Sequence, residues 1–165
     1  MIQYIKKQIR LAIRILTTLF TQTKIGGYVG DRIVENIMNR VQEVEHNGLK
    51  LRFTVPNQLN NFRVHTFSTK EPETLEWIDL MPEDSTLWDV GANVGLYSIY
   101  ASKKKNCRVI AFEPSIFNLE LLARNLYLNG LHDKVTIAPF ALSDGLGTNL
   151  MRMTTTEWGG ALSTF

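Results

Sequence analysis

From residue 86 onward, short apolar segments alternate with longer segments in which apolar residues recur at helical spacing. The short segments cover residues 86–90, 108–112 and 135–140, and they are rich in β-branched and aromatic side chains. Helical spacing begins near Leu96 and again after Ser115, between consecutive short segments. Strands that alternate with helices form a parallel sheet with right-handed crossovers, so this pattern predicts an α/β fold.

The first part of the chain has a different pattern, that of amphipathic helices. Apolar residues recur at helical spacing over residues 2–20: Ile2, Ile5, Ile9, Ala12, Ile13, Leu16 and Phe20. The cations Lys6, Lys7, Arg10 and Arg14 fall on another arc. Such a helix lies on an anionic membrane surface, or it packs on the domain or on a second subunit, which is the more common arrangement. A second helix is expected from Asp31 to the Asn47-Gly48 pair, after a break at three glycines.

The middle of the chain predicts a β-hairpin followed by a helix. Apolar and polar residues alternate over 49–55 and 62–67, on either side of Pro56. Pro72 then suits the first turn of a helix that continues to Met81. The predicted organisation is therefore N-terminal amphipathic helices over residues 1–48, a hairpin and helix over 49–85, and a ligand-binding domain over 86–165.

Composition and charge narrow the functional classes. The chain has 165 residues and a net charge of +2, which does not favour a nucleic-acid partner, although the first 30 residues carry five cations and no acid. A single cysteine, Cys107, permits no internal disulfide and fits a cytoplasmic location. His46, His65 and His132 are not at metal-ligand spacing, so no metal site is predicted. No segment reaches the roughly 18 to 20 apolar residues of a membrane span.

The candidate chemistry lies where the first predicted strand turns into its helix. Asp89 ends the strand, and Gly91 and Gly95 flank Asn93 in the turn. Backbone N–H groups at such a helix N-terminus suit a nucleotide-like ligand. A dinucleotide fingerprint has glycine where this chain has Asn93, and Asp89 would repel a phosphate. The loop therefore favours a ligand with an ammonium group, such as the methionine end of S-adenosylmethionine.

Two further positions extend this predicted site. Glu113 ends the second strand, 18 residues after Gly95, where a carboxylate accepts hydrogen bonds from ribose hydroxyls, although a solvated acid would also fit. Ala141 and Leu142 follow the third strand, where small and apolar residues suit an adenine ring. The tryptophans are less specific: core or interface positions are expected for Trp77 and Trp88, and a substrate-facing loop is one option for Trp158.

The chain resembles the FkbM family of S-adenosylmethionine-dependent methyltransferases. The resemblance is carried by Asp-Val-Gly-Ala-Asn-Val-Gly-Leu-Tyr-Ser at residues 89–98, Ala-Phe-Glu-Pro at 111–114, Asn118, and Ala-Leu-Ser-Asp at 141–144. It implies a Rossmann-like class I methyltransferase fold and methyl transfer to a hydroxyl of a sugar or a natural product. By position, the matching cofactor residues are Asp89, Gly91, Asn93, Gly95, Glu113, Ala141 and Leu142.

A complete class I sheet has more strands than the three that residues 86–165 predict. The sequence is therefore expected to be a truncated copy with an incomplete parallel sheet, and no catalytic residue is assigned. The expected partners are S-adenosylmethionine and a small-molecule or glycan acceptor, with peripheral contact of residues 1–20 to the inner face of the membrane as a further option. An NAD-linked oxidoreductase is disfavoured by Asp89 and Asn93, whereas a non-catalytic interaction module remains the alternative. The oligomeric state is left open.

Overall fold

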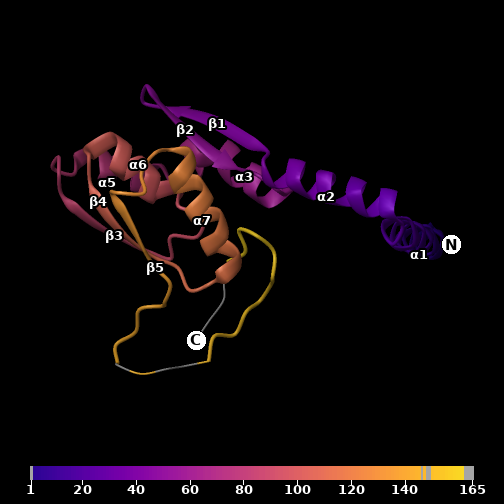
Figure 1. The fold of residues 1–165 in the computed structure, drawn as a ribbon. Helices are drawn as coiled ribbons and strands as arrows, with labels where there is room; N and C mark the ends of the chain where they lie inside the picture. The colour runs from indigo at the N-terminus through magenta and orange to yellow at the C-terminus, as the bar shows by residue number, and fades with distance from the viewer. Residues whose placement is uncertain (1, 146, 148–149, 162–165) are drawn as a thin grey trace. The chain divides into compact units, whose positions relative to one another are not determined.

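The computed structural model describes residues 2–145, 147 and 150–161, and its contacts divide the chain into two units, residues 1–39 and 40–165 (Figure 1). The first unit holds helices α1 (Ile2–Thr21) and α2 (Lys24–Met38). Within the described residues, no helix combines the length and the apolar character needed to cross a bilayer. Among the same described residues there is no cluster of three or more His, Cys, Asp or Glu side chains that could hold a metal ion.

The second helix does not begin at Asp31 or extend to Asn47, so this prediction is wrong at both ends. Its N-cap is Thr23, whose side chain accepts a hydrogen bond from the backbone N–H of Gly26 at 2.9 Å. The glycines do not break the helix, since α2 runs through all three of them, and Gly26 serves a close approach to the end of α1. A Cβ at Gly26 would stand 1.8 Å from the carbonyl oxygen of Phe20.

The second unit begins with an antiparallel hairpin of β1 (Val41–His46) and β2 (Leu49–Thr54). The predicted hairpin of residues 49–55 with 62–67 is therefore wrong in its pairing. Asn47 and Gly48 have φ values of 47° and 77°, and a two-residue hairpin turn of type I′ needs positive φ at both positions. The predicted domain boundary at residue 48 consequently falls inside this turn.

Residues 62–67 belong to helices instead of a strand. The elements here are α3 (Gln58–His65), α4 (Phe67–Lys70) and α5 (Pro72–Leu80). The side chain of Asn57 caps α3 by accepting a hydrogen bond from the N–H of Asn60 at 2.9 Å. Helix α5, which the sequence places at residues 72–81, is confirmed to within one residue.

The rest of the unit is the predicted α/β part: β3 (Thr86–Val90), α6 (Leu96–Lys105), β4 (Arg108–Phe112), α7 (Ile116–Leu128) and β5 (Val135–Ala138). The strands form a parallel sheet in the order β3-β4-β5 (Figure 1). This confirms the α/β fold with a partial parallel sheet. The first two strands have the predicted bounds, whereas the third ends at Ala138, because Phe140 turns back to donate its N–H to the carbonyl of Ala138.

The two faces of this sheet differ. Leu87, Val109 and Val135 are buried on the face that contacts α6 and α7. On the other face Trp88 is 60% exposed, and Trp77 on α5 is 55% exposed, so neither tryptophan fills the core. An interface role for them stays a prediction.

The hairpin is fixed to the α/β part by a buried amide. The side-chain Oδ1 of Asn125 on α7 accepts a hydrogen bond from the backbone N–H of Thr54 at 2.7 Å. Its Nδ2 donates to the backbone carbonyl of Val94 at 2.8 Å. Cys107 is fully buried. The hairpin, α7 and the loop after β3 therefore form one packed body, which positions the site described next.

Candidate functional site

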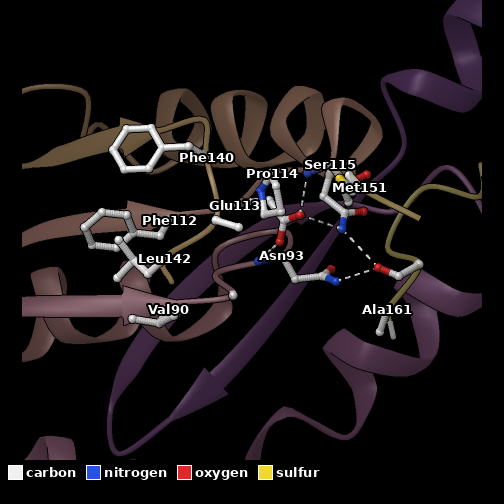
Figure 2. A pocket seen from close by; sticks show the side chains of 14 residues that line it. Val90, Asn93, Phe112, Glu113, Pro114, Ser115, Phe140, Leu142, Met151 and Ala161 are labelled. Atoms are coloured by element: carbon white, nitrogen blue, oxygen red, sulfur yellow. Dashed lines mark hydrogen bonds between the residues drawn. The ribbon is translucent and has the colours of Figure 1, made fainter. Parts of the chain in front are cut away.

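A cavity of about 250 Å³ opens at the carboxyl ends of β3 and β4 (Figure 2). Its apolar side is made by Val90, Phe112, Phe140 and Leu142, whereas Asn93, Glu113, Ser115 and Asn118 supply polar groups on the other side. Ligands of open α/β sheets bind at this edge, where the loops after the strands leave a crevice. A flat aromatic group fits the apolar side, and hydroxyl or amine groups fit the polar side.

The Glu113 carboxylate is held rigidly at the centre of this cavity. Its Oε2 accepts from the N–H of Asn93 at 2.8 Å, and its Oε1 accepts from the N–H of Ser115 at 2.8 Å. Asn118 Nδ2 adds a longer bond of 3.3 Å to Oε1. The side chain is only 5% exposed. A carboxylate oxygen can accept two hydrogen bonds, so Oε2 keeps capacity for a ligand hydroxyl.

Asn93 lines the cavity beside Glu113 and has an unused acceptor. Its φ is 51°, and its Nδ2 donates to the carbonyl of Gly160 at 2.9 Å. Its Oδ1 is buried and has no hydrogen-bond partner among the described residues. A buried acceptor without a partner is costly, so a ligand donor at this position would stabilise it.

Asp89, at the end of β3, is not among the residues that line the cavity. Its Oδ2 accepts a hydrogen bond from the Ser98 hydroxyl at 2.5 Å. Burial raises the pKa of Asp89, and the negative charge of Glu113 raises it further, while the hydrogen bonds from Ser98 act in the opposite direction. A cation bound nearby would relieve this cost.

The remaining predicted residues divide into two groups. Gly91, Ala141 and Leu142 line the cavity together with Asn93 and Glu113. Gly95 does not, because it packs on the core: a Cβ there would stand 2.4 Å from Leu122 Cδ1. The structure thus brings five of the seven predicted residues to one cavity, whereas Asp89 and Gly95 do not line it.

Residues 157–160, here called the strap, close one side of the site through their carbonyl groups. The Trp158 carbonyl accepts from Asn57 and Asn60 at 3.0 and 2.8 Å, and the Gly159 carbonyl accepts from Arg63 at 2.6 and 3.0 Å. The Gly160 carbonyl accepts from Asn93, as described above, and from Asn118 at 3.0 Å. The strap therefore joins α3 to the cavity.

The Trp158 side chain does not line the cavity, because its indole N–H donates to Glu120 Oε2 at 3.2 Å. Sequence reasoning also missed residues that belong to the site. Asn118 was seen only as part of a motif, although its place in the first turn of α7, five residues after Glu113, is a usable signal. Arg63 is absent from the predicted site because the alternating pattern of residues 62–67 predicts a strand instead of a helix.

A second cavity of about 190 Å³ lies beyond the loop after β3. It shares Gly91, Asn93 and Ala161 with the first cavity and is bordered by Arg63, Lys70, Glu71 and Tyr97. Tyr97 donates its hydroxyl proton to Glu71 Oε2 at 2.9 Å, and Lys70 Nζ stands 3.1 Å from Glu71 Oε1. The hydrogen bonds from Lys70 and Tyr97 lower the pKa of Glu71.

The chain is similar in sequence to methyltransferases, although no family model matches it. It is 36% identical over 69 residues to methyltransferase sdnD of Sordaria araneosa, which covers 41% of this chain and 27% of that protein. It is 32% identical over 81 residues to hexuronic acid methyltransferase AglP of Haloferax volcanii, which covers 49% of this chain and 33% of that protein. The chain thus spans a third or less of the length of these curated relatives.

Among solved structures, the chain is similar to P. horikoshii TYW2 in complex with MeSAdo. The TM-score is 0.45 and the sequence identity is 19%, over 65% of this chain and 38% of that chain.

Proposed function

We propose that this chain binds S-adenosylmethionine in the first cavity and forms the cofactor-binding part of a methyltransferase. The observation that carries the proposal is the fixed Glu113 carboxylate, which faces a cavity with an aromatic wall at the carboxyl edge of a parallel sheet. The similarity in sequence to two methyltransferases supports it. The motifs at residues 89–98 and 111–114 further support an assignment to the FkbM family.

The residues present fit this cofactor. Phe112, Phe140 and Leu142 offer apolar surface to an adenine ring, and Glu113 Oε2 can accept from a ribose hydroxyl. The unpaired Oδ1 of Asn93 can accept from an ammonium group, and the nearby negative charge of Asp89 favours a cation. The polar and apolar sides of the cavity thus match the two ends of an adenosyl sulfonium compound.

When bound, S-adenosylmethionine supplies an activated methyl group that leaves in a direct displacement. The contribution of this chain is to hold that donor in one orientation, since alignment of donor and acceptor accounts for much of the rate of such a transfer. Glu113 accepts from the N–H of Asn93, and the Gly160 carbonyl of the strap accepts from Asn93 and Asn118, so these polar groups are fixed relative to one another. The proposed acceptor is a hydroxyl on a sugar or a natural product, and the name of the relative from Haloferax volcanii supports a sugar.

Titration of the full chain with S-adenosylhomocysteine, followed by calorimetry, tests the proposal. Binding is expected for the wild type and is expected to fall at least tenfold for Glu113→Gln, because an amide N–H₂ would oppose the N–H of Asn93 or Ser115. Glu76→Gln, an exposed change on α5, is the matched control and should bind as the wild type does. A wild type that binds NADH but not S-adenosylhomocysteine would overturn the proposal in favour of an oxidoreductase.

For the N-terminal unit we propose a cytoplasmic location with peripheral contact to an anionic membrane surface. The apolar residues of α1 are exposed, among them Ile9 at 53%, Ile13 at 56% and Leu16 at 67%. The cations of the first 30 residues face no acid in that segment, so their charge complements anionic lipid.

Flotation of the full chain with vesicles tests this proposal. Binding is expected for phosphatidylglycerol vesicles and not for phosphatidylcholine vesicles. The pair Ile9→Asp and Ile13→Asp should abolish it. If the chain does not bind vesicles but sediments as a dimer in analytical ultracentrifugation, and the same two changes make it monomeric, α1 packs on a second copy instead.

A further inference from the structure

The second cavity has an unbalanced positive charge on its wall. Arg63 is half-buried on α3, and two of its N–H groups donate to the neutral carbonyl of Gly159. No carboxylate of the described residues lies within ion-pair distance of its guanidinium. Burial lowers the pKa of Arg63, while the charges of Glu71 and Glu113 act in the opposite direction. A planar guanidinium with unused donors is suited to a carboxylate of a ligand.

The only acid on this wall, among the described residues, already has its partners. Glu71 accepts from Tyr97 and forms an ion pair with Lys70. Glu71 is already paired with Lys70, so Arg63 has no ion-pair partner of its own among the described residues, and the charges of Glu71 and Glu113 act on it only from a distance. An anionic ligand would supply such a partner, whereas a neutral one would leave a half-buried cation unpaired.

The position of this cavity assigns it to the second substrate. The two cavities meet at Gly91, Asn93 and Ala161. A cofactor bound in the first cavity with its adenine against Phe112 would end at this shared rim. A molecule in the second cavity would then face that end, as a methyl acceptor must.

We propose that the second cavity binds the methyl acceptor and that this acceptor carries a carboxylate which pairs with Arg63. This inference rests on the proposed function, since it requires the methyl donor in the first cavity. The guanidinium holds the acid group, and the Tyr97–Glu71 pair offers polar partners to hydroxyl groups of the same molecule. A sugar acid, or another small hydroxy acid, meets both requirements.

The experiment compares two sugars on the full chain saturated with S-adenosylhomocysteine. Methyl glucuronide and methyl glucoside share their ring and differ in one group, a carboxylate against a neutral hydroxymethyl. We expect the glucuronide to bind at least tenfold more tightly, because a hydrogen-bonded charge pair is worth that factor. Arg63→Gln should remove the preference, whereas Arg108→Gln, an exposed change at the far end of β4, should preserve it.

Arg63 also holds the strap, so Arg63→Gln could fail to fold. In that case Arg63→Lys carries the test: it keeps the charge without the planar fork and should reduce the preference about threefold to tenfold. An unchanged preference in the lysine variant would overturn the role of Arg63.

The remaining outcomes separate this inference from the function on which it rests. If the wild type binds S-adenosylhomocysteine but does not distinguish the two sugars, the acceptor assignment fails and the cofactor assignment stands. If the glutamine variant loses affinity for S-adenosylhomocysteine but not for methylthioadenosine, which lacks the amino-acid carboxylate, Arg63 reads the cofactor and the inference is overturned. If the wild type does not bind S-adenosylhomocysteine at all, the proposed function itself fails.

Discussion

The two glycines of the loop after β3 have nearly the same positive φ but different surroundings, so their substitution should separate stability from binding. Gly91 has a φ of 80° and Gly95 a φ of 84°. A Cβ at Gly91 would meet nothing within 4 Å, whereas a Cβ at Gly95 would stand 2.4 Å from Leu122 Cδ1. Leu122 is fully buried, so it cannot move away freely.

The expected free energies follow from these contacts. Alanine in the left-handed region costs about 1–2 kcal/mol, and reduced freedom of the unfolded chain offsets about 0.4–1 kcal/mol of that. Both variants share this cost. Gly95→Ala must also displace Leu122, which adds about 1–3 kcal/mol of overpacking. Gly95→Ala should therefore unfold more easily than Gly91→Ala by about 1–3 kcal/mol.

Ligand affinity should show the reverse order. Gly91 lines both cavities, so its new methyl group would occupy the space proposed for the ligand. Gly48→Ala is the matched control, because Gly48 has a φ of 77°, meets nothing within 4 Å and lies in the hairpin turn. Urea unfolding and calorimetry with S-adenosylhomocysteine on the three variants provide the measurements. Equal urea midpoints for Gly91→Ala and Gly95→Ala, or equal affinities for Gly91→Ala and Gly48→Ala, would refute the reasoning.

Two other substitutions test the charge of Asp89 and the buried hydrogen bonds of Asn125. Asp89→Asn should stabilise the ligand-free chain more and more as the pH rises from 3.8, the ordinary pKa of the carboxyl group, through its raised pKa in the folded chain, because the protonated form that burial favours is lost over that range. It should also weaken the binding of S-adenosylhomocysteine at least tenfold. Melting temperatures of the wild type and the variant that do not diverge with pH would contradict the stability prediction. Asn125→Leu should lower the free energy of unfolding by about 2–4 kcal/mol, because the N–H of Thr54 and the carbonyl of Val94 lose their partner. Asn61→Leu, an exposed change on α3, should alter it by less than about 0.5 kcal/mol in urea unfolding.

The α/β part was predictable because its local and long-range signals agree. The strand at residues 86–90 is an apolar run bounded by turn residues, and it remains a strand in the sheet. Glu113 and Leu142 follow the ends of two parallel strands, so topology alone brings them to one edge. For these residues, position along the chain was enough to indicate position in space.

The N-terminal half of the second unit was not predictable in the same way. Asn47-Gly48 ends a helix as readily as it turns a hairpin, and only pairing with residues 49–54 decides between them. Residues 62–67 alternate in polarity, which predicts a strand, so the predicted site does not include Arg63. Its contact with Gly159 joins residues 96 positions apart through a main-chain oxygen, which no pattern of side chains encodes.

The way in which the strap is attached has a consequence for how this protein can change over evolutionary time. Amide and guanidinium groups grip its main chain, and Gly159 leaves no room for a larger residue, since a Cβ would stand 2.6 Å from Asn60 Oδ1. Selection on the strap should therefore preserve its length, its backbone conformation and Gly159, while its outward side chains can vary. Descendants of this chain could exchange those side chains without losing the closure.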